Sequence, residues 1–277
     1  MTRRVHVLLL TAAVLAALAG CNRDRDEPRA PLPPEKGDQS ATVTPADAAA
    51  PFAFESQNAF ASVKLTLPQA LKTQPDLHAR LYSTAVRDLR QFNEGAQADR
   101  TEAGGDAGMP PYEKIITFEG VVETGKLFSL SRADYDFTGG AHGNTLYAGV
   151  LWDKALKRPV ESAAVFRSGA DLTALDQALC AAVNAEKHAR DPQAVVLTLT
   201  GTDWACPRSA ATPFVLTAST TPGKAGGLTF LIGPYLVGSY AEGTLEVAVP
   251  QSAFRALLAP AYADEFAGAP VKPAPAA

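Results

Sequence analysis

Histidine and cysteine, the side chains that metal and catalytic sites use most often, are scarce in this sequence. There are four histidines and three cysteines among 277 residues, and no two histidines have the spacing of a metal-ligand pair. The glycine patterns of a serine-hydrolase nucleophile elbow, a P-loop and a dinucleotide site are also missing. The formal net charge is -4, so there is no basic excess either. We therefore expect no metal, no cofactor and no nucleic-acid partner, whereas a basic protein partner is compatible with the charge.

The start of the chain has the features of an export signal that ends in a lipid anchor. Two arginines at positions 3 and 4 precede an apolar run at 7–19, and the tetrapeptide LAGC at 18–21 resembles a bacterial lipobox. In such lipoproteins the cysteine is lipidated after cleavage, so Cys21 would anchor the chain to the membrane. Asn22 then favours the outer membrane, facing the periplasm. The open alternative is a plain secretory signal with Cys21 incidental.

Both ends of the chain beyond this signal are too poor in apolar side chains to form a core. Residues 21–51 are charged and then rich in proline and alanine, which predicts a disordered linker after the signal peptide at 1–20. Residues 263–277 share the alanine and proline bias and are expected to form a flexible tail. The part between them, about 210 residues, is long enough for one large domain or two small ones.

Alternating and helical hydrophobic patterns divide this part into strands and two long helices. Helices are expected after Pro75 and after Asp171, and a short one at 251–258. Strands are expected at 62–67, from 112, at 126–136, 144–153, 195–199, 213–218, 228–232 and 243–249. Strands and helices without regular alternation predict an α+β fold, with a mainly antiparallel sheet, helices packed on one face, and two small lobes in tandem.

A glycine-rich corner at 134–144 joins two of these strands and holds the residues best suited to chemistry. Three glycines within five positions indicate a backbone that needs positive φ or a close approach of another segment. Asp134 and Asp136 share one face of their strand and could meet His142 across the corner, as in a divalent-metal site. The alternative is structural: His142 donates a hydrogen bond that fixes the corner, and the aspartates cap turns.

Cys180 and Cys206 are the two cysteines left after lipidation. Outside the inner membrane the compartment is oxidising, so we expect a disulfide between them that joins the second long helix to the loop after 195–199. Closing this loop should contribute roughly 3 kcal/mol. An inert buried thiol at Cys180 is the alternative.

The order of these motifs resembles the extracytoplasmic DUF3298 family, over residues 131–262. Residues 52–130 are similar to its usual companion, the PdaC/RsiV-like DUF4163 domain. One departure is the turn after Asp153, where residues 154–157 hold no glycine. The family motif falls on Gly139, Gly140, His142, Gly143, Asn144, Tyr235, Tyr240 and Gly243.

The resemblance implies a role in the bacterial envelope in which the shared region is not the catalyst. Family members include envelope lipoproteins, a lysozyme-recognising anti-sigma factor and the accessory region of a peptidoglycan deacetylase. We therefore expect a non-catalytic binding module whose partner is lysozyme or a peptidoglycan-associated ligand. The alternative is a peptidoglycan-modifying or metal-dependent envelope enzyme that uses Asp134, Asp136 and His142.

Overall fold

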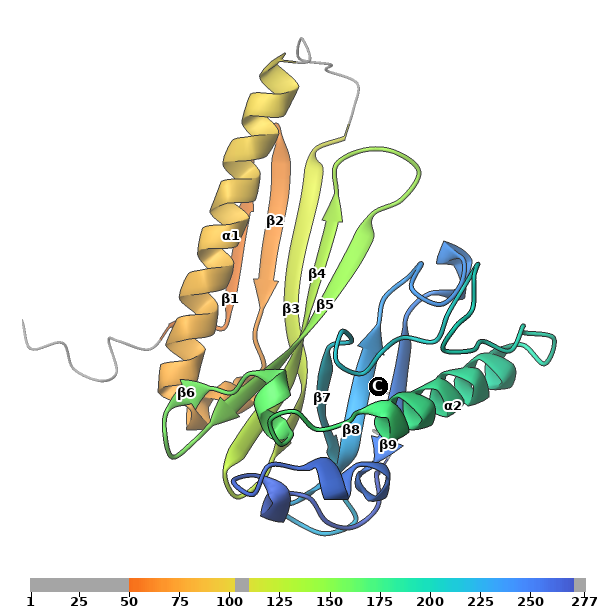
Figure 1. The fold of residues 1–277 in the computed structure, drawn as a ribbon. Helices are drawn as coiled ribbons and strands as arrows, with labels where there is room; N and C mark the ends of the chain where they lie inside the picture. Colours follow the sequence, from red (N-terminus) through yellow and green to blue (C-terminus); the bar gives the residue numbers. More distant parts are fainter. Residues whose placement is uncertain (1–49, 103–109, 272–277) are drawn as a thin grey trace, which may run out of the picture. The chain divides into compact units, whose positions relative to one another are not determined.

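A computed structural model describes residues 50–102 and 110–271 of the chain. Two sheets and two long helices make up the fold (Figure 1). Within the described residues, no helix is both long and apolar enough to cross a bilayer. The signal peptide, Cys21 and nearly all of the expected linker lie outside these residues.

The larger sheet has six strands in the order in which they follow one another along the chain. They are β1 (Ala53–Gln57), β2 (Ala61–Thr66), β3 (Tyr112–Glu123), β4 (Leu127–Phe137), β5 (Asn144–Asp153) and the short β6 (Arg158–Pro159). All neighbours pair antiparallel except β2 and β3, which are parallel. A parallel pair needs a long crossover, and the helix α1 (Pro75–Glu102) provides it.

One face of this sheet is covered by α1 (Figure 1). The alternating pattern of β2 buries Val63 and Leu65 against the helix, where they meet Leu77 and Leu89. Further along the same face lie Ile116, Phe118, Phe128, Leu130 and Trp152. The apolar stripe of α1 and the inward residues of alternate strand positions therefore form one core.

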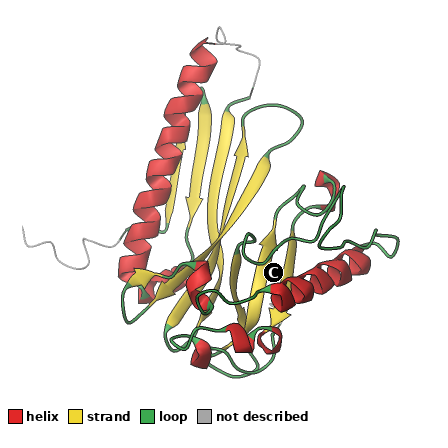
Figure 2. Cartoon of the chain, in the orientation of Figure 1, coloured by secondary structure: helices red, strands yellow, loops and turns green. Residues whose placement is uncertain are grey.

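The smaller sheet has three antiparallel strands, β7 (Phe214–Ala218), β8 (Ala225–Ile232) and β9 (Leu245–Pro250). The helix α2 (Thr173–Arg190) packs on β9, and Leu175, Leu179 and Val183 are fully buried in the second core. Loops and short 3-10 turns make the remaining connections (Figure 2). The predicted α+β class with two lobes is confirmed.

The two sheets touch through backbone. Gly149 of β5 lies so close to β7 that a Cβ there would overlap the carbonyl of Phe214. Nearby, the Leu216 amide donates to the buried Ser129 hydroxyl of β4 at 3.0 Å. Only glycine permits this approach, so the two lobes share β4 and β5 as a common wall.

Three local predictions were wrong. Residues 195–199 form no strand; they make one isolated bridge, between Thr198 and Ala205. Residues 251–258 form two 3-10 turns instead of a helix, η4 (Gln251–Ala253) and η5 (Arg255–Leu257). Residues 263–271 of the expected flexible tail are packed, because η6 (Ala263–Glu265) precedes the buried Phe266, which bridges to Ala225 of β8.

The strand β1 was not expected, and neither was the backbone of the turn after Asp153. β1 follows the predicted linker directly and pairs with β2 over five residues. In the β5–β6 turn, Lys157 has φ 49° at the end of the stretch where the family comparison led us to expect glycine. The Asp153 carboxylate holds the turn by accepting from the amides of Ala155 and Leu156.

Candidate functional site

The glycine corner is the loop between β4 and β5, and it has the backbone that its glycines indicated. Gly139 has φ 102° and Gly140 has φ 92°, a region that side chains rarely adopt. Gly143 is needed for a different reason: a Cβ there would overlap the ring of Tyr135. The corner therefore turns at two glycines and then packs its third against β4.

His142 lies between two tyrosines that come from the far end of the sequence. Its ring stacks on that of Tyr240, with centroids 3.7 Å apart and planes 14° apart. Its Nδ1 lies 2.9 Å from the Gly143 carbonyl, and its Nε2 lies 3.2 Å from the Tyr235 hydroxyl. A carbonyl can only accept, so Nδ1 carries a proton and donates to it; in the neutral ring Nε2 then accepts from the Tyr235 hydroxyl. Both ring nitrogens are thus engaged.

The Gly143 carbonyl is the point where the two segments are joined. It accepts a hydrogen bond from His142 Nδ1 and a second one from the hydroxyl of Tyr240, the latter at 3.0 Å. We name the set His142, Gly143, Tyr235 and Tyr240 the aromatic corner. Sequence analysis placed all four in the family motif, and the structure brings them together across more than ninety positions of sequence.

Unusual backbone also shapes the second half of the aromatic corner. Tyr235 has φ 67° although it is not glycine, and Gly243 has φ 69°. Between them the turn η3 (Tyr240–Glu242) begins with a capping box in which Ser239 and Glu242 exchange hydrogen bonds. Tyr235 is 50% exposed and Leu236 is 56% exposed, so this loop presents apolar surface to solvent.

Helix α2 fixes η3 from the other side. The Lys187 ammonium is buried, and it donates to the Val237 carbonyl and to the Glu242 carboxylate, each at 2.6 Å. Arg190 donates to the carbonyls of Glu242 and Thr244. The loop that carries Tyr235 and Tyr240 is therefore tied both to the glycine corner and to α2.

The proposed cluster of two aspartates and His142 is not assembled. Asp134 binds Arg132 at 2.8 Å, and the same guanidinium binds Asp88 of α1 at 2.9 Å. Asp136 pairs with Lys114 at 4.0 Å. In the described part of the chain, no three histidine, cysteine or acidic side chains are grouped to hold a metal ion.

Strand alternation explains this correction. Positions 132, 134 and 136 share one face of β4, and Arg132 shows that it is the face toward α1. Tyr135 points to the opposite face, where it meets Gly143. Burial raises the pKa of the Tyr135 hydroxyl, and the charge of Glu113 raises it further.

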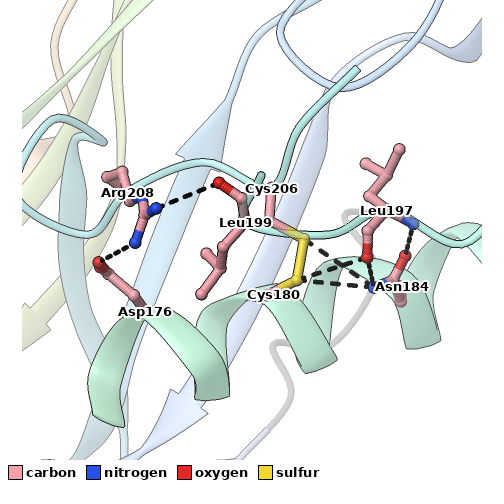
Figure 3. Close-up of a disulfide and its surroundings, with 7 residues drawn as sticks. All are labelled: Asp176, Cys180, Asn184, Leu197, Leu199, Cys206 and Arg208. Carbon is pink, nitrogen blue, oxygen red and sulfur yellow. Dashed lines mark hydrogen bonds and ion pairs between the residues drawn. A yellow bond between two sulfur atoms is a disulfide. The ribbon is translucent and has the colours of Figure 1, made fainter. Parts of the chain in front are cut away.

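Cys180 and Cys206 are joined by a disulfide, with Cα atoms 5.1 Å apart (Figure 3). It links α2 to the returning end of the loop 191–206. The side chain of Asn184 holds the middle of this loop, because it accepts from the Leu197 amide at 2.7 Å and donates to the Leu197 carbonyl at 2.9 Å. Past Cys206, the Asp176 carboxylate of α2 binds Arg208 (Figure 3).

A groove of about 760 Å³ lies between this loop, the end of α2 and η3. We call it the α2 groove. Sequence analysis missed this groove. Its exposed apolar wall comes from the stretch 195–199, which was expected to form a strand, and from Trp204. Its lining includes Lys187, Asp191, Val195, Val196, Asp203, Trp204, Glu242 and Leu245.

Comparison with known proteins agrees with the predicted family. Residues 54–145, from β1 to the start of β5, match the family model described as deacetylase PdaC. No curated protein matches the chain.

Solved structures supply the second part of the comparison. A DUF3298 family protein from Pseudomonas aeruginosa is 16% identical, with a TM-score of 0.51 over 80% of this chain and 99% of that one. A DUF3298 family member from Bacteroides fragilis is also 16% identical, with a TM-score of 0.52 over 77% and 95% of the two chains. The chain thus carries a PdaC-type, DUF4163-like region at residues 54–145 and has the fold of DUF3298 family proteins.

Proposed function

We propose that this chain is a non-catalytic binding module of the bacterial envelope. Lipidated Cys21 would hold it at the outer membrane, facing the periplasm, and residues 22–51 would space the folded part from the lipid. Its partner is lysozyme or a peptidoglycan-associated ligand. Lysozyme is the sharper candidate because it is basic, whereas this chain falls to -6 once the signal arginines are lost.

The closure of the aromatic corner is the observation that carries this proposal. Both nitrogens of His142 and the hydroxyls of Tyr235 and Tyr240 bind one another or the Gly143 carbonyl. These groups hold two distant segments in one rigid arrangement. In the same loop, the partly exposed side chains of Tyr235 and Leu236 present aromatic and aliphatic surface to solvent. Exposed aromatic surface of this kind is enriched at protein-binding sites.

The same contacts favour binding over catalysis. A general base needs a nitrogen or oxygen that can reach the proton of a substrate, but the nitrogens of His142 are occupied within the corner. The carboxylates of Asp134 and Asp136 are paired with Arg132 and Lys114 on the other face of β4. We therefore do not extend the deacetylase activity in the matched family's name to this chain.

Titration calorimetry tests the proposal. The full-length chain, purified in a non-ionic detergent, is titrated with egg-white lysozyme and separately with soluble peptidoglycan fragments. We expect lysozyme to bind with a micromolar or tighter Kd. Tyr235→Ser combined with Leu236→Ser should weaken binding, whereas Leu156→Ser, also at an exposed position, should not. Absence of heat with both ligands would contradict the proposal.

A further inference from the structure

The first wall of the α2 groove contains a strand-like sequence that lacks a partner strand. Residues 195–199 read Val-Val-Leu-Thr-Leu, a composition typical of β-strands. Val195 is 78% exposed and Val196 is 69% exposed. Within the residues that the structure describes, the backbone amides and carbonyls of these two valines have no hydrogen-bond partner. Unpaired backbone beside exposed β-branched side chains can pair with another chain.

This wall is held in place instead of being loose. The Asn184 side chain binds both the amide and the carbonyl of Leu197 (Figure 3). The two valines that precede Leu197 remain exposed. The Cys206 amide donates to the Thr198 carbonyl at 2.8 Å, and the disulfide fixes Cys206 to α2. A partner that binds here meets a preformed surface, so little conformational entropy is lost on binding.

The opposite wall and the rim give the groove an acidic character. Its two cations are neutralised, because Lys187 binds Glu242 and Arg190 binds Glu186. Among the described residues, Asp191 and Asp203 have no ion pair. The next residue after Asp203, Trp204, is 41% exposed and also lines the groove. A carboxylate next to an exposed indole suits a lysine or arginine side chain, which can form an ion pair and a cation–π contact together.

We propose that the α2 groove is the docking site for an extended, positively charged segment of a partner protein. The segment pairs through its backbone with Val195 and Val196 and places a cationic side chain against Asp203 and Trp204. This mode of recognition adds a strand to an unpaired backbone edge. The inference rests on the proposed binding function and names the surface and the partner chemistry that serve it.

Two probes test the groove with the full-length chain. One is egg-white lysozyme; the other is a short capped peptide of alternating lysine and valine, with a glutamate-for-lysine peptide as its control. We expect the lysine peptide to bind and the glutamate peptide not to bind. Trp204→Ala should weaken lysozyme binding about tenfold or more, as at interface hot spots. Asp203→Asn should weaken it about threefold to tenfold, with a smaller effect at high salt.

Matched variants separate the groove from general effects. Asp99→Asn removes an exposed charge on α1, away from the groove, and should leave binding within about twofold of wild type, in line with the small effect of single surface charges. Val196→Pro removes the amide hydrogen needed for strand pairing and should abolish peptide binding. Thermal melting of each variant shows whether it is folded. If the proline variant is unfolded, Trp204→Ala and Asp203→Asn alone decide whether the groove binds the partner.

The outcomes distinguish the groove from the proposed function. If lysozyme binds and both groove variants bind equally well, the groove inference is overturned while the binding function stands. If the lysine peptide binds in a manner that depends on Trp204 but lysozyme does not bind, the groove is supported and lysozyme is excluded. If the wild-type chain binds neither probe, the groove inference is overturned, and the binding function is overturned with it unless peptidoglycan fragments bind.

Discussion

Removing the disulfide should destabilise the protein strongly, and the structure sets the magnitude. The bonded cysteines are 26 positions apart, and closing a loop of this length in the unfolded chain corresponds to about 3.5 kcal/mol at 25 °C. The native loop keeps its other anchors without the bond, namely Asn184 to Leu197 and Asp176 to Arg208. We therefore expect nearly the whole loss to act through the unfolded state in the double variant Cys180→Ala, Cys206→Ala.

Urea unfolding followed by circular dichroism measures this loss. In thermal unfolding, the Tm of a domain of this size should fall by about 7 to 14 °C as a result of the same loss. The stability of wild-type protein kept reduced with a thiol reagent should fall by a similar amount. Because the reduced protein keeps both cysteines, this control separates loss of the bond from a packing effect of alanine at the buried Cys206. A loss below about 1 kcal/mol in both experiments would refute the reasoning, since the loop entropy predicts several times more.

Three further predictions concern packing and charge. Glu265→Ala should cost about 2 to 3 kcal/mol in urea unfolding, because the buried carboxylate accepts from the β3–β4 turn; no loss would contradict this. Gly149→Ala should cost about 2 kcal/mol or more by overlapping β7, whereas Gly95→Ala, in open space on α1, should stabilise by about 0.5 to 1 kcal/mol; equal effects would refute the comparison. Burial and the charge of Glu119 raise the pKa of Glu246, so stability should fall as pH rises from about 4.5 through that pKa. Glu246→Gln should flatten this fall in Tm and raise stability at neutral pH by at most about 0.5 kcal/mol; an unchanged profile would contradict it.

The sequence was most informative where a pattern depends on neighbouring residues. The β4 and β5 alternation and the glycines between them predicted a hairpin with a special backbone, and Gly139 and Gly140 have it. The same alternation could have excluded the metal cluster. Arg132, Asp134 and Asp136 necessarily share a face, so a basic residue lies beside Asp134 and pairs with it, while Asp136 pairs with Lys114 of the neighbouring strand.

Long-range contacts account for what the sequence did not reveal. Residues 195–199 have strand composition, but α2 satisfies Leu197 through Asn184, so the segment has no strand beside it. The tail bias at 263–277 hid Glu265 and Phe266, whose burial depends on β8 and on a turn about 140 positions earlier. Likewise, the family motif included His142, Tyr235 and Tyr240, but their contact was not predicted, because the tyrosines follow His142 by more than ninety positions.

The central claim is that this chain binds a basic partner protein through a preformed, acidic surface. The most direct test is the Kd of the full-length chain for egg-white lysozyme, measured by calorimetry at low and at high salt. The account predicts micromolar or tighter binding that weakens severalfold as salt rises, because opposite charges steer and hold the complex. No binding at low salt, or binding that salt leaves unchanged, would contradict it.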